Sequence, residues 1–299
     1  YEYGNNALSA ETNYIRQVQP FTRDLDEVSK QLFSLATNGG EEYCGAVIQR
    51  SLADLQWNRH PKAYKVIFIA GNEPFTQGPI SAHKACKDGI KKEITINTIH
   101  CGSRNDGIRG KWHDGAALAG GKFLIINQDQ AVCHIDAPQD KKIAELNSQL
   151  NDTYIPYGTH GRAGKQKQEA ADSNANTHSK SGAALQRAIT KSTKNYSNAS
   201  WDLIDAVKET GVKLESIDQK KLPEGMRNLT EEQLKNKLQQ ITLKRSEIQS
   251  TIQKLNQERS VYITEERKKL AASSTITLDE AIVQTTRQQA EKKGYLFLK

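Results

Sequence analysis

The feature that most constrains this chain is a strand that runs directly into a polar loop led by glycine. Residues 65–70 read Lys-Val-Ile-Phe-Ile-Ala, and Gly71-Asn72-Glu73 follow at once. An apolar, largely β-branched run is typical of a strand that is covered on both faces, as in a parallel sheet. A second such strand, 94–101, follows after about two dozen residues, the length of a helical crossover. The pair predicts a βαβ unit.

Polar residues follow both of these strands. Gly71-Asn72-Glu73 come after the first, and His100-Cys101-Gly102 end the second. Ligands of open parallel sheets bind outside the carboxyl ends of the strands. We therefore expect any functional residues of this domain at that edge of the sheet.

The neighbouring segments alternate between strand and helix patterns. Strands are expected at 14–21, 64–70, 94–101 and 122–127, and helices at 24–37, 41–57, 79–90 and 111–118. This alternation predicts an α/β fold with a doubly wound, mostly parallel, Rossmann-like sheet. Residues 1–4 read as the tail of a strand without an initiator Met, so we expect an amino-terminally truncated domain whose first strand is missing.

The second half of the chain has a different composition. Residues 158–200 are rich in Gly, Ser, Asn, Lys and Gln and predict a linker with some helix. Apolar residues or arginines then recur at spacings of four and three from Leu234 to Tyr262, which predicts a coiled-coil heptad seam. Arg245 and Arg259 on this seam disfavour a long homomeric coiled coil. We expect a helical hairpin that packs on itself or on a partner.

Three regions are therefore expected. They are an α/β domain over 1–135, a linker with some helix over 136–200 and a helical hairpin extension over 201–299. Residues 230–299 of this hairpin could also hold copies of the chain together in an oligomer.

The net charge of +7 arises entirely in the second half, where residues 151–299 hold 25 Lys or Arg and 18 Asp or Glu. The basic residues alternate with glutamates along helical segments, and aromatic residues are few, so nucleic acid is not the expected partner. No run approaches the roughly 18 apolar residues that a membrane span requires. The sequence therefore favours a protein as the partner.

Several of the segments named above carry a family resemblance. They are Asp24-Leu-Asp-Glu-Val-Ser29, Asn38-Gly-Gly-Glu-Glu-Tyr-Cys-Gly45, Val66-Ile-Phe-Ile-Ala-Gly-Asn-Glu-Pro74, Ile96-Asn-Thr-Ile-His-Cys-Gly102 and Trp112 through Ala119-Gly-Gly121. Over residues 1–135 the chain resembles a von Willebrand factor type A domain of a bacterial branch. The resemblance implies a central, mostly parallel sheet between helices, and likeness to secreted members favours the bacterial envelope, either periplasmic or secreted.

The resemblance also implies a metal-ion-dependent adhesion site, where a divalent ion, commonly Mg²⁺, binds a partner's carboxylate. The first of its three loops, Asp-x-Ser-x-Ser, is absent, and the other two correspond to 39–42 and 71–73 without the usual Thr and Asp. Glu42 (or Glu41), Asn72 and Glu73 would offer oxygen ligands to Mg²⁺ or Ca²⁺. Alternatively, the glutamates only complement a helix dipole and Asn72 only serves the turn in a left-handed conformation.

Two cysteines are expected near the same edge of the sheet. Cys44 lies early in a predicted helix and Cys101 at the end of a strand. They could form a disulfide in an oxidising compartment, Cys44 could be a reactive thiol, or both could be buried structural residues. Beyond these thiols, the sequence holds no zinc-type Cys pair, histidine cluster, Gly-x-Ser-x-Gly or Walker loop, so we expect a protein that is not an enzyme.

Two functions remain open. The first is a non-enzymatic, adhesion-type protein-binding module that acts through a degenerate metal-ion-dependent adhesion site at the sheet rim. The alternative is a metal-free structural scaffold whose helical carboxy-terminal region mediates assembly.

Overall fold

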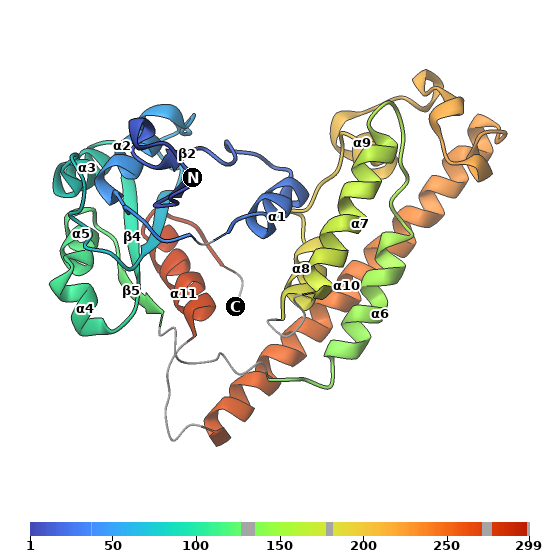
Figure 1. Cartoon of the computed structure of the whole chain (residues 1–299). Helices are drawn as coiled ribbons and strands as arrows, with labels where there is room; N and C mark the ends of the chain where they lie inside the picture. The colour runs from blue at the N-terminus through green and yellow to red at the C-terminus, as the bar shows by residue number, and fades with distance from the viewer. Residues whose placement is uncertain (37, 127–134, 178–181, 271–276, 298–299) are drawn as a thin grey trace. The chain divides into compact units, whose positions relative to one another are not determined.

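Three segments far apart in the sequence build the first of two units in the computed structural model, which describes residues 1–36, 38–126, 135–177, 182–270 and 277–297. The sheet unit comprises Tyr1–Phe21, Leu35–Val132 and Thr275–Lys299, and the helical unit comprises Thr22–Ser34 and Cys133–Ser274. Figure 1 shows the elements of each unit. This division differs from the three consecutive regions expected from the sequence.

A parallel sheet of three strands forms the centre of the sheet unit. The strands β3 (Lys65–Gly71), β4 (Ile94–Cys101) and β5 (Phe123–Ile126) pair in the order β3-β4-β5. The helices α2 (Cys44–Asp54), α3 (Ala82–Lys91), α4 (Arg104–Arg109) and α5 (Trp112–Leu118) belong to the same unit. The predicted mixed α/β fold and its βαβ unit are confirmed. Residues 37 and 127, where a predicted helix and a predicted strand ended, lie outside the described residues.

The predicted strand over 14–21 is wrong in length. Only β2 (Ile15–Arg16) forms, and it pairs antiparallel with β1 (Glu2–Tyr3) in a separate sheet of two strands. Tyr14 has a positive φ of 54°, which interrupts an extended run before it, and Pro20 lacks an N–H with which to continue a ladder.

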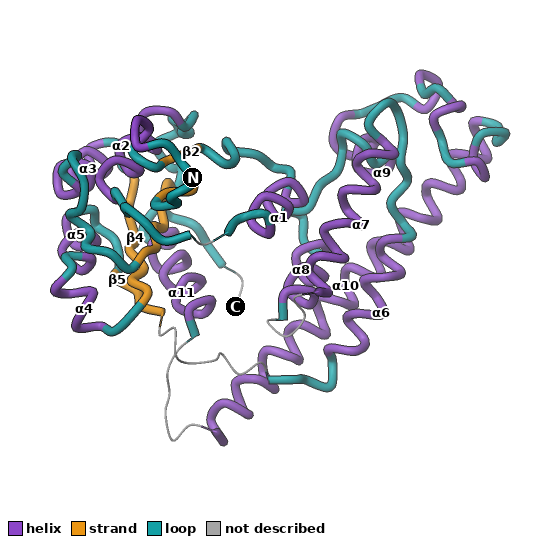
Figure 2. Tube along the Cα trace, in the orientation of Figure 1, coloured by secondary structure: helices purple, strands orange, loops and turns teal. Residues whose placement is uncertain are grey.

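The two faces of β4 meet different partners, because successive side chains of a strand point to opposite sides. Ile94 and Ile96 are buried in the apolar cluster that also holds residues of α2 and α3. On the other face, Asn97 exchanges two hydrogen bonds with Gln289 of α11 (Leu278–Glu291), at 2.8 and 3.0 Å. Figure 2 shows α11 on one side of the strands and α3 to α5 on the other.

The last helix therefore belongs to the sheet unit. The hydroxyl of Tyr64 donates a third hydrogen bond to Gln289, at 2.7 Å, and α11 also contacts β5. The expected helical hairpin over 201–299 is wrong in this respect, since α11 packs on the sheet. The reason is a polar amide pair that a hydrophobic pattern does not reveal.

The described part of the helical unit contains α1 (Leu25–Phe33), α6 (Asp140–Asn151), α7 (Gly161–Thr177), α8 (Ala183–Lys191), α9 (Leu203–Thr210) and α10 (Glu231–Leu270). One apolar cluster includes Ile143, Leu150 and Ile252, and a second includes Leu203 and Leu234. Between α9 and α10 lie only short 3-10 turns.

Residues 136–200 are not the expected linker, because α6, α7 and α8 have a common buried interior. Small residues let the chain approach closely there: a Cβ on Gly164 would lie 2.2 Å from the ring of Trp201. Polar side chains such as Gln168 and Lys191 are fully buried and hydrogen-bonded. The interior is therefore built from small and paired polar residues, which composition alone does not distinguish from a linker.

The predicted heptad segment is confirmed as a single helix, α10. Its seam residues Leu234, Leu238, Ile248 and Ile252 are buried in the two clusters of the same unit. The seam arginines pair with carboxylates of this chain, Arg245 with Asp202 and Arg259 with Asp140. Within the described residues, no helix is long and apolar enough to cross a membrane.

Candidate functional site

Three loops meet at the carboxyl edge of the sheet and are joined by hydrogen bonds. Oε2 of Glu42 accepts from the backbone N–H of Asn72 at 2.9 Å and of Glu73 at 3.2 Å. The indole of Trp112 donates to the carbonyl of Glu73 at 2.8 Å. Phe75 N donates to the carbonyl of Gly110, also at 2.8 Å. We call the loops 38–43, 71–78 and 102–111 the rim.

Glycines make room for the Glu42 carboxylate. A Cβ on Gly71 would lie 2.3 Å from Oε2 of Glu42 and 2.8 Å from the hydroxyl of Tyr3. Gly4 has a φ of +79°, and a Cβ there would lie 2.7 Å from Cγ of Glu42. No other residue type fits either position without a shift, so the backbone around Glu42 is shaped to admit its side chain.

Glu42, Asn72 and Glu73 lie together at the carboxyl edge of the sheet, as expected from the sequence. The contacts of Glu42 and the conformation of Asn72 differ from those expected. Helix α2 begins at Cys44, so Glu41 and Glu42 precede it and do not lie in its first turn. Asn72 is not among the described residues with positive φ, so it does not serve the turn through a left-handed conformation. Glu42 instead links two loops.

Oε2 of Glu42, one of the oxygens expected to bind a divalent ion, already accepts from two backbone N–H groups. The N–H groups of Asn72 and Glu73 point their positive ends at Glu42, where they would repel a cation. The Asn72 amide donates to Glu73 at 3.5 Å, so these two side chains face each other. Among the described residues, no group of three or more His, Cys, Asp or Glu could hold a metal ion. We therefore derive no chemistry from Mg²⁺ or Ca²⁺.

The Cys44 thiol is free and fully buried, so the expected disulfide with Cys101 is not formed. Burial raises the pKa of Cys44 to about 12, whereas a reactive thiol needs a lowered pKa. Its position at the start of α2 does not compensate for the loss of water. Of the three alternatives left open by the sequence, the buried structural role is the one that agrees with the full burial of Cys44.

His100 lies beneath the rim, where its ring packs at 5.8 Å from that of Trp112. It is buried, and burial lowers the pKa of the imidazole, so the neutral form is favoured. Its neighbour Cys101 is half-buried at the end of β4. Because adjacent strand residues point to opposite faces, the two do not act on each other.

Substitution of Glu42 tests its role as a loop anchor. We expect Glu42→Ala to lower the free energy of unfolding by about 1–3 kcal/mol, because two backbone N–H groups lose a charged acceptor. Glu42→Gln keeps an acceptor oxygen and should lose less. Urea unfolding measures both, with the neighbouring Glu41→Ala as the control. Equal stability of Glu42→Ala and the parent, or a rise in the midpoint on addition of MgCl₂, would contradict the anchor role.

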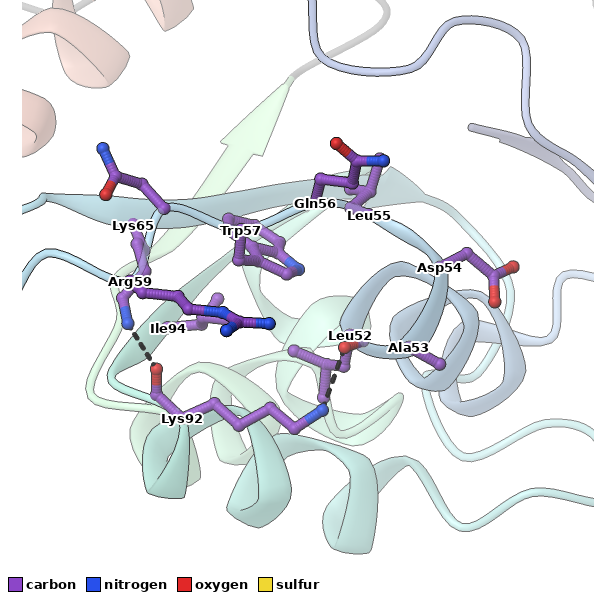
Figure 3. Close-up of a pocket in the computed structure, with 11 residues that line it drawn as sticks. Leu52, Ala53, Asp54, Leu55, Gln56, Trp57, Arg59, Lys65, Lys92 and Ile94 are labelled. Carbon is purple, nitrogen blue, oxygen red and sulfur yellow. Dashed lines mark hydrogen bonds between the residues drawn. The ribbon is translucent and has the colours of Figure 1, made fainter.

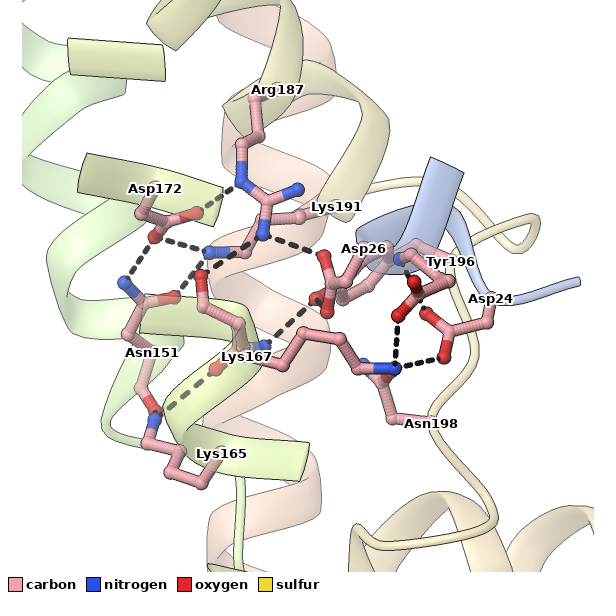
Figure 4. A network of polar contacts seen from close by, with 12 residues as sticks. Asp24, Asp26, Asn151, Lys165, Lys167, Asp172, Arg187, Lys191, Tyr196 and Asn198 are labelled. Atoms are coloured by element: carbon pink, nitrogen blue, oxygen red, sulfur yellow. Dashed lines mark hydrogen bonds and ion pairs between the residues drawn. The ribbon is translucent and has the colours of Figure 1, made fainter. Parts of the chain in front are cut away.

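A second polar cluster, which was not expected from the sequence, lies in the helical unit (Figure 4). Asp172 accepts from Arg187 and from Nζ of Lys191, the latter at 2.9 Å. Arg187 also donates to Asp26 at 2.7 Å, and Tyr196 donates to Asp26 at 2.8 Å. We call these five residues the ion cluster. They come from four segments, and neither motif nor spacing connects them.

The charges of the ion cluster balance one another. Burial disfavours the charge of Asp172, but Lys191 and Arg187 outweigh it and hold the pKa of this carboxyl below its usual range. Burial would lower the pKa of Arg187, but Asp26 and Asp172 raise it. Lys191 is fully buried, and here burial prevails over Asp172 and lowers its pKa to about 8. Two cations and two carboxylates therefore satisfy each other, as in a structural ion pair.

The lowered pKa of Lys191 predicts a pH dependence of stability. The unfolded chain keeps this proton up to its ordinary pKa of 10.5, while the folded chain releases it near 8. The unfolded state thus binds more protons between these values, so stability rises with pH there. We expect a gain of roughly 2 kcal/mol from pH 7.5 to 9.5 relative to Lys191→Met, measured by urea unfolding. Parallel pH profiles of the two proteins would contradict it.

No protein-family model, no curated protein and no solved structure matches this chain.

Proposed function

We propose that the sheet unit is a non-enzymatic protein-binding module that presents the rim to its partner without a metal ion. The observation that carries the proposal is the linkage of three loops through Glu42, Trp112 and the Phe75 backbone. Loops that are held in place lose little conformational entropy on binding, which favours affinity.

The exposed residues of the rim suit a protein surface. Ile108 of α4 is 41% exposed beside Arg109, whose guanidinium pairs with Asp106. Asn72 is exposed at the tip of the loop after β3. Arginine is enriched at protein interfaces, so an exposed apolar side chain next to Arg109 suits a protein partner.

The resemblance to von Willebrand factor type A domains supports the same function. In that family a partner protein binds at the carboxyl edge of a doubly wound sheet, and we infer that the three parallel strands belong to a sheet of this kind. The alternative, assembly through the heptad seam of α10, receives no such support, because the seam residues are buried within the chain itself.

Site-specific photo-cross-linking tests the proposal. A benzophenone amino acid at Ile108 should give a discrete protein adduct in extracts of the cells that make this chain, and Arg109→Glu should abolish it. The matched control is Ile90 of α3, which is 44% exposed and lies outside the rim. Identical adducts from the two positions, or an adduct that is indifferent to Arg109→Glu, would overturn the proposal.

A further inference from the structure

A cavity of about 920 Å³ lies at the opposite edge of the sheet from the rim, where β3 and β4 begin (Figure 3). Its lining comes from the end of α2, the segment 55–59 and the first residues of the two strands. No functional residue was expected at this edge from the sequence. Cavities of 300–1,000 Å³ commonly take small molecules. We call it the amino-edge pocket.

One part of the amino-edge pocket is apolar and held in a fixed geometry. Leu52 and Ile94 are buried and line it together with the indole of Trp57. The indole N–H donates to the carbonyl of Ser51 at 2.9 Å, and the ring of Phe21 packs edge-on against it at 5.0 Å. The orientation of the indole is therefore set before any ligand arrives, which suits stacking on a flat ring.

The other part of the pocket is cationic. Nζ of Lys65 donates to the carbonyl of Lys92 at 2.8 Å, and Nζ of Lys92 donates to the carbonyl of Leu52 at 2.9 Å. Each ammonium group has three donors, so one hydrogen bond to a backbone carbonyl positions it while others remain for a ligand. Figure 3 shows the guanidinium of Arg59 between Trp57 and the side chain of Lys92.

Nearby carboxylates do not cancel these three charges. Asp54 pairs with Arg50, which lies outside the pocket lining, at 2.9 Å. Glu93 lies 3.7 Å from Lys65, but it also lies 3.8 Å from Lys293. Arg59 and Lys92 have no carboxylate within salt-bridge distance among the described residues. The pocket therefore has a positive potential beside an apolar wall.

We propose that the amino-edge pocket binds a small aromatic anion, a flat ring that carries a phosphate or carboxylate group. The ring stacks on Trp57 and contacts Leu52 and Ile94, while the anion accepts hydrogen bonds from Lys65, Lys92 and Arg59. Charge-assisted bonds of this kind to phosphate or carboxylate are the strong ones. The pocket is separate from the rim, so the cross-linking result at Ile108 does not bear on it.

Calorimetric titration of the full chain tests the inference with 1-naphthyl phosphate and 1-naphthoate as probes. At least one should bind saturably at a single site, and the two together show which anion is preferred. Neutral 1-naphthol and inorganic phosphate should each bind at least about tenfold more weakly than that probe. The naphthol lacks the anionic group, and inorganic phosphate lacks the aromatic ring. Binding should also weaken as salt is raised.

Variants locate the site. Arg59→Gln and Trp57→Leu should each weaken binding of the preferred probe by about tenfold, whereas Lys84→Gln, an exposed lysine of α3, should not change it. Arg59 is exposed, so its substitution leaves the fold intact. Lys92→Gln should also weaken binding of the preferred probe, and its unfolding midpoint is measured beside that of the parent because Lys92 bonds to the carbonyl of Leu52. Absence of saturable binding of both anions, or binding that is unchanged in Arg59→Gln and Trp57→Leu, would overturn the inference.

Discussion

Replacing Arg245 with Met should lower the free energy of unfolding of the helical unit by about 3–5 kcal/mol, because a buried ion pair loses one partner. Arg245 is 4% exposed. Its guanidinium donates to Asp202 at 2.7 Å and to Asp205 at 2.9 Å, and it lies 4.2 Å from the ring centre of Tyr154. Without it, the fully buried carboxylate of Asp202 loses its ion-pair partner among the residues that the structure describes, and that uncompensated charge is the cause of the loss.

The control for Arg245 is its neighbour in the sequence. Lys244→Met makes a similar change of residue type at an exposed position of α10 and should shift stability by less than about 0.5 kcal/mol. The double variant Arg245→Met/Asp202→Asn should recover part of the loss, because both charges are removed while Asn still caps α9. Urea unfolding followed by circular dichroism measures all three. A loss below 1 kcal/mol for Arg245→Met would contradict the buried pair.

A loss of about 3–5 kcal/mol is also expected for Asp172→Ala, for the opposite reason. Here two cations remain without their shared carboxylate: Arg187, which keeps Asp26, and Lys191, whose ammonium is fully buried. Lys191 should then lose its charge at a lower pH than in the parent, since Asp172 raises its pKa against the effect of burial. The loss of stability should therefore be largest near pH 7 and smaller near pH 9.

Glu169→Ala is the matched control for Asp172→Ala. Glu169 lies on the same helix, α7, but its side chain is 59% exposed. Its carboxylate lies 4.0 Å from Nζ of Lys165, at the outer limit of an ion pair. Exposed pairs contribute about 0–1 kcal/mol, so this variant should remain near the parent. If both variants lost the same stability, or if the loss in Asp172→Ala were independent of pH, the ion cluster would not act as a buried charge network.

Periodic apolar residues predicted the parallel strands and most helices, because burial of one face or of both imposes those patterns on a sequence. The short helix α4 was missed, since six residues are too few to show a period. Helices α7 and α8 lie where only a linker with some helix was expected, because their interior is made of alanine, glycine and paired polar groups. The attachment of α11 depends on Asn97 and Gln289, and a single amide pair across 192 residues leaves no periodic signal.

The candidate sites were predictable to different degrees. The topology of the βαβ unit placed Asn72 and Glu73 at one edge, and the family resemblance added Glu42; hydrogen bonds join Glu42 to both in the structure. The conformation of the loop after β3, however, could not be predicted from the sequence. It directs the N–H groups of Asn72 and Glu73 to the Glu42 carboxylate, so Glu42, which was expected to be a metal ligand, holds this loop in place. The amino-edge pocket combines Trp57, Lys65 and Lys92 from three segments, so only the folded chain brings them together.

The discontinuous sheet unit has a consequence for synthesis on the ribosome. Helix α11 follows the whole helical unit in the sequence, so β4 is translated long before its covering helix exists. At 5–20 residues per second, the 176 residues between Cys101 and Leu278 leave that face open for roughly 9–35 s. Exposed β-rich apolar strands aggregate in such intervals unless a polar residue interrupts them. Asn97, flanked on the same face by Thr95 and Ile99, supplies the interruption, and the helix that later buries it carries the matching amide.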